Sequence, residues 1–530
     1  MVDMTQIAAP DHGGQPRRLV VVGAGMAAVR LVEELTARDA DWQVTLVGEE
    51  PVAPYNRILL SAVLEGSHRP DALELRPRAW YDERGIDLQL GRRVLGIDTE
   101  RRDVMLVDGT LIPYDALVLA TGAIPTLPPI RGLVRMDGTL NPAVHAFRSL
   151  ADCDRLRATL AAVDADGRPR HRRAVVVGGG LLGLQVARAL GTRGLDTEIV
   201  EGADHLLHSQ LDTAAGRILA RDLRKLGVAV YTGARAVRLN DASDGPRLTS
   251  PAPAVAGGAV KVVDPLPRHP GRMALQLDNG FTLDTDLVVL TAGGRPSTAL
   301  ARGAGLQVRR GIVVDDRLTT SDPHVFAIGD CAQHDGRVTG FVPPAWEQAG
   351  ILADILAGGS RSYAGHRNVA RLRATDLDVA VLGDAAAEIA AGGEVVEVSN
   401  PIAGSHRRLV VRGGRIVAAT LVGDLHRVGL ITQHFDRGTV LGPTEPGALL
   451  MPEPTAAGTA AAAVTGLPDD AEICACAGVA AGRIRACSSV EEARDTTRAT
   501  TGCGGCLSTV RALVGSAPSG SLTASSASKG

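Results

Sequence analysis

The chain has 530 residues, of which 45% are hydrophobic and 22% are charged, and its formal net charge is −3. The length is several times the roughly 150 residues of an average domain, so a single small binding module is excluded and a multidomain globular protein is expected. The small net charge gives no electrostatic reason to expect a nucleic acid or an anionic membrane as partner.

The sequence predicts a cytoplasmic protein. Its first residues lack the basic region and apolar stretch of a signal peptide, and no run of about 18 apolar residues follows. Five of the seven cysteines lie within the last sixty residues, which is too concentrated for disulfides spread through a secreted protein of this size. We therefore expect no membrane partner, and a local metal or redox site in a reducing compartment.

The first predicted element is a strand that turns into a helix, in RRLVVVGAGMAAVRLVEEL. Gly23 and Gly25 lie at the turn, and Ala28 takes the third position of a GxGxxG-type pattern. The first glycine permits the tight turn, the second lets a pyrophosphate approach the helix N-terminus, and Ala28 allows close packing. After the next predicted strand, Glu49 or Glu50 is the expected acceptor for a ribose hydroxyl. A glycine turn that serves packing alone is the alternative.

A second copy of this arrangement begins about 155 residues later, in HRRAVVVGGGLLGLQVARALGTRGLDTEIVEG. It has the full pattern, with Gly178, Gly180 and Gly183, and its following strand ends at Glu201. A carboxylate beside the 2′-hydroxyl accepts its hydrogen bond and repels a 2′-phosphate, and the glycine and alanine that follow supply no guanidinium. The pattern therefore favours NADH over NADPH. A phosphate loop for another nucleotide is the alternative.

Composition divides the rest of the chain into further units. Residues 241–271 are rich in Pro, Gly, Ala and Ser and predict a surface insertion, after which strand-like and helical patterns return. The fold class is α/β, and the expected units are 17–125 with 305–358 as a first dinucleotide-binding domain, 171–300 as a second, 365–445 as a small α+β domain, 446–470 as a linker, 471–515 as a cysteine-rich domain and 516–530 as a disordered tail.

Three further motifs lie between and after the two glycine turns. An ATG stretch contains Thr121 and Gly122, TAGGRP at 291–296 contains Gly293, and a distal GD pair contains Asp330. With the two glycine turns, this order resembles the flavoproteins with two dinucleotide-binding domains, the glutathione-reductase-like FAD/NAD proteins. The resemblance implies FAD in the first domain and NAD(H) in the second. It also implies that Asp330 binds the ribityl chain of FAD and that the Thr121–Gly122 turn approaches this cofactor.

A more specific resemblance lies in EEPVAPYNRILLSAVLEG, residues 49–66. This stretch is similar to the flavoprotein part of NAD(P)H-dependent nitrite reductase large subunits and of the electron-transfer subunits of assimilatory nitrate reductases. Other segments extend the similarity over about residues 17–515. The resemblance implies that Arg57 contacts the flavin or the pyrophosphate, with a surface arginine as the alternative, and that Trp346 and Gln348 lie beside the isoalloxazine.

Four cysteines form two close pairs, Cys474 with Cys476 and Cys503 with Cys506. Two pairs of thiolates suit a [2Fe-2S] cluster, one pair for each iron, and the segment resembles the small helical [2Fe-2S] domain of bacterioferritin-associated-ferredoxin type found in the same reductases. Zinc is the alternative, although zinc-binding pairs are usually separated by two to four residues. The stretch between the pairs is shorter than in that family, and Cys487 within it is an alternative ligand.

The remaining cysteines predict no redox role. The disulfide-reductase branch of these flavoproteins carries a CxxxxC pair after its first glycine helix, whereas no cysteine here precedes Cys153. A dithiol relay beside FAD is therefore excluded. Cys331 follows the GD pair directly, but an isolated apolar cysteine usually serves packing, and no function is assigned to it.

Together the motifs imply an NADH-oxidising FAD and [2Fe-2S] electron-transfer flavoprotein, an NAD(P)H-dependent oxidoreductase in which hydride enters and single electrons leave. No general acid, base or nucleophile is expected to be catalytic. Because no siroheme part is recognised, the resemblance implies a separate partner, the molybdenum-containing catalytic subunit of an assimilatory nitrate reductase. The alternatives are a separate siroheme nitrite reductase as partner, or a redox- or iron-responsive flavoprotein.

Overall fold

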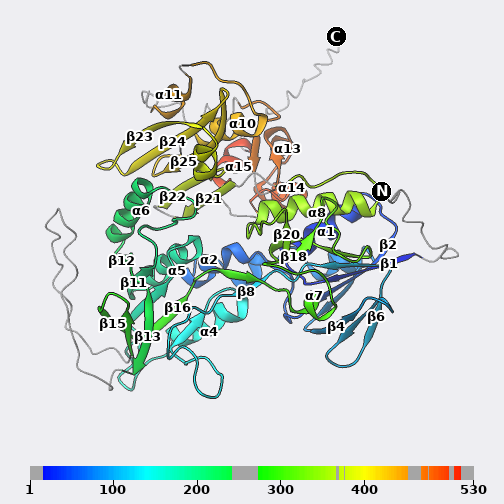
Figure 1. The fold of residues 1–530 in the computed structure, drawn as a ribbon, viewed down its shortest axis with the longest axis horizontal. Coiled ribbons are helices and arrows are strands. Elements are labelled where there is room, and N and C mark those ends of the chain that lie inside the picture. The colour runs from blue at the N-terminus through cyan, green and yellow to red at the C-terminus, as the bar shows by residue number, and fades with distance from the viewer. Residues whose placement is uncertain are drawn as a thin grey trace, which may run out of the picture. The chain divides into compact units, whose positions relative to one another are not determined.

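The computed structural model describes residues 16–241, 273–365, 369–374, 377–425, 427–443, 445–451, 467–474, 477–500 and 506–514. Most of the predicted insertion, most of the predicted linker and all of the predicted tail at 516–530 lie outside these residues. The chain forms two compact units, the first comprising Met1–Ala370 and Ser399–His406 and the second the remainder (Figure 1). Within the described part, no helix is long and apolar enough to cross a membrane.

The first unit begins with a five-stranded parallel sheet of order β19-β7-β1-β2-β3. Its strands are β1 (Arg17–Val22), β2 (Trp42–Gly48), β3 (Asp87–Leu90), β7 (Ala116–Leu119) and β19 (Val325–Ala327). Strands β1, β7 and β19 contain continuous runs of buried apolar residues, because both faces of a parallel sheet are covered. Helices α1 (Met26–Thr36) and α8 (Val342–Leu356) pack against each other beside it. Strand β19 therefore brings part of segment 305–358 into the sheet.

A second parallel sheet repeats the arrangement, with order β12-β11-β10-β16-β9. Its strands are β9 (Val144–Ala146), β10 (Arg173–Val177), β11 (Asp196–Glu201), β12 (Val228–Thr232) and β16 (Leu287–Leu290), and its helices are α5 (Leu181–Thr192) and α6 (Thr213–Lys225). An apolar core joins it to a meander of β13 (Ala236–Asp241), β14 (Met273–Leu277) and β15 (Thr282–Thr285). The two glycine turns thus begin two equivalent βαβ units.

Shorter elements connect and cover the two sheets. Strands β8 (Ala123–Pro125) and β17 (Gly294–Pro296) pair antiparallel and link the segments that follow β7 and β16. The others in this unit are β4 (Val94–Asp98), β5 (Asp103–Leu106), β6 (Leu111–Pro113), β18 (Ile312–Val314), β20 (Ala332–His334), η1 (Arg57–Leu59), η2 (Pro70–Leu73), η3 (Gly329–Cys331), α2 (Leu60–Glu65), α3 (Arg78–Asp82), α4 (Leu150–Leu160) and α7 (Ala299–Gly303).

The second unit contains most of a five-stranded sheet of order β21-β22-β25-β24-β23 and a small cysteine-rich part. The sheet and its helices are β21 (Val369–Ala374), β22 (Leu377–Leu382), α9 (Ala385–Ala390), β23 (Glu394–Asn400), β24 (Ser405–Arg412), β25 (Arg415–Val422), α10 (Val428–Arg437) and α11 (Glu445–Leu450). Helix α11 lies at the start of the segment predicted as a linker, because Leu449 and Leu450 are buried apolar side chains rather than solvated ones.

The cysteine-rich part is mostly helical among its described residues. It consists of β26 (Glu472–Cys474), β27 (Val479–Ala480), α13 (Ala481–Arg485), α14 (Val490–Thr497) and α15 (Leu507–Val514). These short elements share one apolar core that includes Val479, Ile484 and Val510. Since each helix is too short to be stable alone, their stability depends on this shared core.

One buried carboxyl group makes the stability of the first unit depend on pH. Burial raises the pKa of Glu198 on β11 to about 7 from its ordinary 4.5, although Tyr231 donates a 3.1 Å hydrogen bond to it. Between these values the folded protein holds a proton that the unfolded chain releases, so stability falls as pH rises from 4.5 to 7.

Glu198→Gln should therefore raise the free energy of unfolding at pH 8 by at most about 3 kcal/mol, and with it the thermal midpoint. This gain in stability should shrink as the pH is lowered. Thermal unfolding at pH 5.5 and pH 8 measures this. The exposed Glu100→Gln variant is the control and should behave as wild type at both pH values. An unchanged pH dependence in Glu198→Gln would contradict the assignment of a neutral buried carboxyl.

Candidate functional site

The glycine turn after β1 contains two glycines that are required for different reasons. Gly23 has φ +106°, and a Cβ there would lie 2.3 Å from the carbonyl oxygen of Ala120, so the fold itself demands glycine. Gly25 has an ordinary extended conformation and, among the described residues, open space where its Cβ would be. Packing therefore gives no reason for glycine at position 25, whereas a pyrophosphate at the N-terminus of α1 does. Ala28 is fully buried in the helix that follows.

The turn after β10 repeats this contrast. Gly178 has φ +117°, and its Cβ would lie 2.7 Å from the carbonyl oxygen of Thr291. Gly183 is closed in more tightly, because its Cβ would lie 1.9 Å from the oxygen of Gly178. Gly180, the N-cap of α5, again has an extended conformation and open space around it. Both turns thus provide room for a phosphate where the helix dipole favours one.

The carboxylate of Glu201 is held in place at the end of β11. The backbone N–H groups of Gly179 and Ala203 donate to its two oxygens at 2.6 Å and 2.8 Å. The side chain is only 12% exposed. A carboxylate oxygen can accept more than one hydrogen bond, so the fixed group retains capacity for a ribose hydroxyl beside the glycine turn.

The two acids after β2 differ in their surroundings. Glu49 is 71% exposed, and its carboxylate lies 3.6 Å from Nε of Arg93. Glu50 accepts a 2.8 Å hydrogen bond from the Tyr55 hydroxyl and pairs with Arg57. Glu49 is therefore the more accessible of the two predicted ribose acceptors.

Arg57 belongs to a side-chain network rather than projecting alone. Its guanidinium lies 4.9 Å from the centre of the Tyr55 ring and donates a 3.4 Å hydrogen bond to the carbonyl oxygen of Arg148. The Tyr55 hydroxyl in turn accepts from the backbone N–H of Leu150 at 2.8 Å. The segment that carries Tyr55 and Arg57 is thereby tied to the start of α4.

The ATG turn contacts the segment after β17. The hydroxyl of Thr121 donates to the carbonyl oxygen of Ser297 at 2.8 Å, and the carbonyl of Gly122 accepts from the Ser297 N–H at 2.9 Å. Gly122 and Gly293 both have positive φ, +66° and +87°, with open space around each. The two motifs therefore fix the antiparallel pair of β8 and β17, which we call the β8–β17 crossover.

Helix α8 holds the GD turn. The buried amide oxygen of Gln348 accepts a 2.7 Å hydrogen bond from the N–H of Gly329, the residue before Asp330. Trp346 is buried, and the guanidinium of Arg30 on α1 lies 5.8 Å from its ring. Burial raises the pKa of the Cys331 thiol, which donates to the carbonyl oxygens of Leu119 and Ile328, both at 3.3 Å. The Cys331 thiol is therefore buried and hydrogen-bonded to the backbone within the protein core.

Arg148, which the sequence did not indicate, contacts the predicted site residue Asp330. Its Nη2 lies 2.8 Å from Oδ2 of Asp330, and its Nε donates to the carbonyl oxygen of Ala123 at 2.8 Å. Asp330 and Arg148 are 182 residues apart, so only the fold brings them together. The feature of the local sequence that marks this position is the capping box of Ser149 and Asp152, which begins α4 directly after Arg148.

Two of the four predicted cluster ligands can be located. Cys474 is buried on β26, and the partly exposed Cys506 packs against the same small core. Cys476 and Cys503 lie outside the described residues. Within the described part, no three His, Cys, Asp or Glu side chains gather as a metal-binding group. The thiol of Cys487 donates to the carbonyl oxygen of Arg483 at 3.3 Å, which gives it a partner within its own helical segment.

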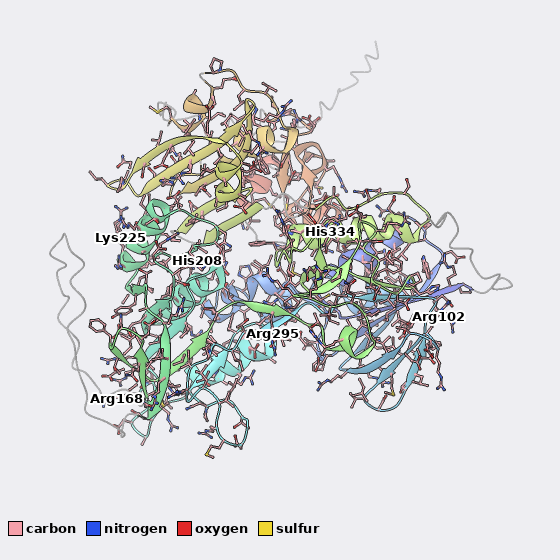
Figure 2. All side chains as sticks on the ribbon, viewed as in Figure 1. Arg102, Arg168, His208, Lys225, Arg295 and His334 are labelled. Atoms are coloured by element: carbon pink, nitrogen blue, oxygen red, sulfur yellow. The ribbon has the colours of Figure 1, made fainter. Side chains whose placement is uncertain are left out.

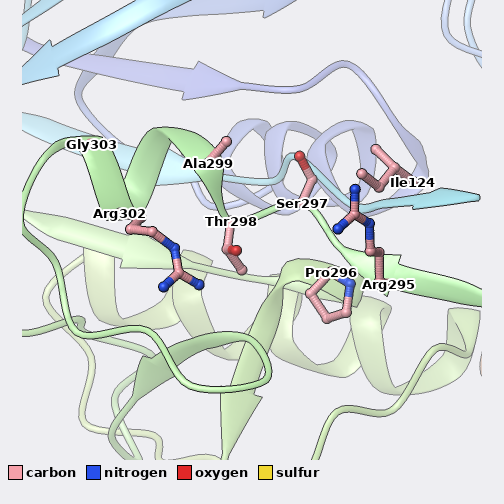
Figure 3. Close-up of a pocket in the computed structure, with 8 residues that line it drawn as sticks. All are labelled: Ile124, Arg295, Pro296, Ser297, Thr298, Ala299, Arg302 and Gly303. Atoms are coloured by element: carbon pink, nitrogen blue, oxygen red, sulfur yellow. The ribbon is translucent and has the colours of Figure 1, made fainter. Parts of the chain in front are cut away.

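A pocket of about 530 Å³ adjoins the crossover, and Figure 3 shows its lining. It is formed by Ile124 of β8, the end of β17 and helix α7, with the guanidinium groups of Arg295 and Arg302 at its sides. Ser297, which holds Thr121, also lines it, so the pocket lies next to the ATG turn.

Two βαβ units, each with an open glycine at a helix N-terminus and an acid after the next strand, define a flavin- and pyridine-nucleotide-binding protein. Residues 17–349 match the family model described as pyridine nucleotide-disulphide oxidoreductase, and the chain belongs to this family. It is therefore assigned to the NAD(P)H-dependent FAD oxidoreductases, with FAD and NAD(H) as cofactors. The α/β fold expected from the sequence and the family resemblance are confirmed.

Two curated relatives match nearly the whole chain. The nitrite reductase [NAD(P)H] of Bacillus subtilis is 33% identical over 94% of this chain and 57% of its own length. The assimilatory nitrate reductase electron transfer subunit of Bacillus subtilis is 29% identical over 94% of this chain and 59% of its own. The chain thus spans a little over half the length of these relatives.

The structure is also similar to that of the covalent putidaredoxin reductase–putidaredoxin complex. The TM-score is 0.66 with 26% sequence identity, and the match covers 82% of this chain and 95% of that chain. This similarity supports the flavoprotein fold across most of the described residues.

The contact between Arg148 and Asp330 leads to a prediction about flavin affinity. If Asp330 holds the ribityl chain, Arg148 keeps its carboxylate oriented, and Arg148→Met should weaken FAD binding about tenfold through loss of a charge-assisted hydrogen bond. Refolding of flavin-free protein with increasing FAD, followed by flavin fluorescence, measures the dissociation constant. The control is Arg157→Met, which removes an exposed pair with Asp154. Equal FAD affinity in both variants would argue against this role for Arg148.

Proposed function

We propose that the chain is an NADH-oxidising electron-transfer flavoprotein that binds FAD, NAD(H) and a [2Fe-2S] cluster. In this proposal, 17–125 with 305–358 bind FAD, 171–300 bind NADH and 471–515 carry the cluster. The observation that carries the proposal is the duplicated turn in which Gly25 and Gly180 have ordinary backbone conformations and open surroundings. A ligand that needs close approach to the backbone accounts for glycine at both positions.

FAD, when bound, supplies a carrier that exchanges two electrons with NADH and single electrons with a cluster. The protein's own residues bind and orient the cofactors. Glu201 receives the adenosine ribose of NADH, Asp330 with Arg148 receives the ribityl chain, and the Thr121–Gly122 turn shapes the flavin side of the crossover. No side chain needs to act as general acid or base, because hydride transfer requires chiefly alignment and exclusion of water.

The cluster assignment rests on the two cysteine pairs. Cys474 and Cys506 come from opposite ends of the cysteine-rich part and pack against one core, which supports a site formed by both pairs. A CxC pair suits zinc less well than a [2Fe-2S] cluster. Thiolate ligands of this kind stay reduced in the cytoplasm, the proposed location.

We propose the molybdenum-containing catalytic subunit of an assimilatory nitrate reductase as the electron acceptor. The similarity to an assimilatory nitrate reductase electron transfer subunit over 94% of this chain supports this partner. The second candidate is a reductase component for a siroheme nitrite reductase, which the 33% identity to a nitrite reductase [NAD(P)H] favours. Reconstitution with each purified partner and NADH, with nitrite or ammonium as the measured product, separates the two.

The Cys503→Ser variant tests whether electrons pass from FAD to the cluster and from the cluster to the partner. The variant should lose the cluster absorbance and electron transfer to the partner but keep NADH oxidation with a two-electron dye, because the dye takes electrons from FAD. The control is Cys487→Ser, which should retain the cluster since the Cys487 thiol already has a hydrogen-bond partner. Loss of dye reduction in Cys503→Ser would contradict the proposed order, and loss of the cluster in Cys487→Ser would identify Cys487 as a ligand.

A further inference from the structure

A bidentate ion pair joins α2 to α5, the helix that begins at the second glycine turn. Nη1 of Arg188 on α5 donates to one carboxylate oxygen of Glu65 on α2 at 3.0 Å, and its Nη2 lies 3.0 Å from the other oxygen. The Arg188 side chain is 11% exposed and the Glu65 side chain 23%. Because this pair makes two contacts and is largely shielded from water, it restrains both distance and orientation, unlike a single exposed contact.

The local structure of α2 gives no reason for an acid at its end. Glu65 is the last residue of the helix, where the helix dipole disfavours a negative charge, and Gly66 then ends the helix with φ +96°. Arg193, the C-cap of α5, donates to the carbonyl oxygen of Leu64 at 3.1 Å. The end of α2 is therefore held by α5 at two neighbouring points.

The opposite ends of the two helices lie at the proposed cofactor sites. Helix α2 follows η1 directly, and Arg57 of η1 donates to the carbonyl oxygen of Arg148, the residue that contacts Asp330. Helix α5 begins after its N-cap Gly180, and Arg188 lies about two turns further along it. Since α2 and α5 pack against each other (Figure 1), a change at their ion pair should shift one proposed site relative to the other.

We propose that Arg188 and Glu65 are positioning residues for hydride transfer, whose ion pair sets the separation between the NADH site and the flavin site. The inference rests on the proposed function, in which a hydride leaves NADH as NAD⁺ forms and FAD gains two electrons. The rate of such a transfer depends steeply on alignment, and a displacement of about 1 Å can cost about a hundredfold. Binding of NADH depends on its own contacts at the second glycine turn, so the pair should affect the rate of transfer more than affinity.

Anaerobic stopped-flow mixing of the FAD-loaded protein with NADH separates these two effects. The limiting rate of flavin bleaching reports hydride transfer, which an isotope effect with NADH deuterated at the transferred position verifies, and the half-saturating concentration reports NADH binding. Arg188→Met and Glu65→Gln should each lower the limiting rate about tenfold and change the half-saturating concentration less than about twofold. Arg188→Lys can replace two contacts by one, and its limiting rate should lie between those of wild type and Arg188→Met.

The double variant tests whether the two residues act as a pair. Arg188→Met combined with Glu65→Gln should be as slow as either single variant, because each single change already removes the interaction. The matched control is Lys225→Gln, which removes an exposed ion pair with Asp222 on α6 (Figure 2). This control should change neither the limiting rate nor the half-saturating concentration.

A merely structural ion pair would lower the thermal midpoint of the variants and leave the limiting rate of flavin bleaching at the wild-type value. That result overturns the inference and leaves the cofactor sites as proposed. A double variant that slows by the product of the two single effects overturns it as well, since the residues then act independently. Failure of NADH to bleach the flavin of the wild-type protein overturns the proposed function itself.

Discussion

Gly180→Val should lower NADH oxidation by about two orders of magnitude or more while the bound FAD remains at the wild-type level. Gly180 has φ −77° and ψ 178°, a conformation that valine adopts readily, and no described atom lies within 4 Å of its Cβ position. The new side chain therefore fits the protein but fills the space needed by the pyrophosphate.

Dye reduction with NADH, together with flavin absorbance, measures this effect. Gly191→Ala is the control within the same helix, because its Cβ would make an ordinary 3.7 Å contact with Val228. Alanine in the helix should stabilise the protein slightly. Wild-type turnover in Gly180→Val would mean that the second glycine turn does not bind the nucleotide.

Gly25→Val should yield a folded protein without FAD. Gly25 is the N-cap of α1 with φ −93° and ψ −172°, so valine imposes no backbone strain there. Loss of close approach between the pyrophosphate and the helix N-terminus should weaken FAD at least about hundredfold, corresponding to about 3 kcal/mol. Flavin content after purification measures this, and circular dichroism checks the fold.

The control for this variant is Gly350→Ala in α8, where the Cβ position is 4.0 Å from the Glu34 carboxyl carbon. This variant should keep its FAD. Since the two turns are separate, Gly25→Val should still bind 5′-AMP at the second site. Retention of FAD by Gly25→Val would contradict the assignment of the first turn to this cofactor.

The sequence predicted the parts of the site that depend on short segments. The strand–turn–helix around Gly23 and that around Gly178 are local, so their glycine spacing was sufficient to predict both turns. The structure adds why each glycine is needed: Gly23 and Gly178 for close backbone contacts, Gly25 and Gly180 for open space. Sequence spacing alone does not separate these reasons.

The parts that were missed depend on contacts between distant segments. Arg148 contacts Asp330 across 182 residues of sequence, and Arg235, in the connection after β12, lies beside Gly202. Gly202 and Ala203, which follow Glu201 in the chain, supply no guanidinium, whereas the packing of the connection after β12 brings the side chain of Arg235 beside Gly202. Helix α11 was missed because its apolar pair, Leu449 and Leu450, is embedded in a composition typical of linkers.

We propose that electrons pass from NADH through FAD to a [2Fe-2S] cluster within this chain. Anaerobic titration of the purified protein with NADH, followed by flavin absorbance and electron paramagnetic resonance, detects the reduction of both centres. We expect flavin bleaching together with the signal of a reduced [2Fe-2S] cluster in the wild type, and bleaching alone in Cys503→Ser. Bleaching of the flavin in iron-replete wild-type protein without any cluster signal would show that FAD does not reduce a cluster in this chain.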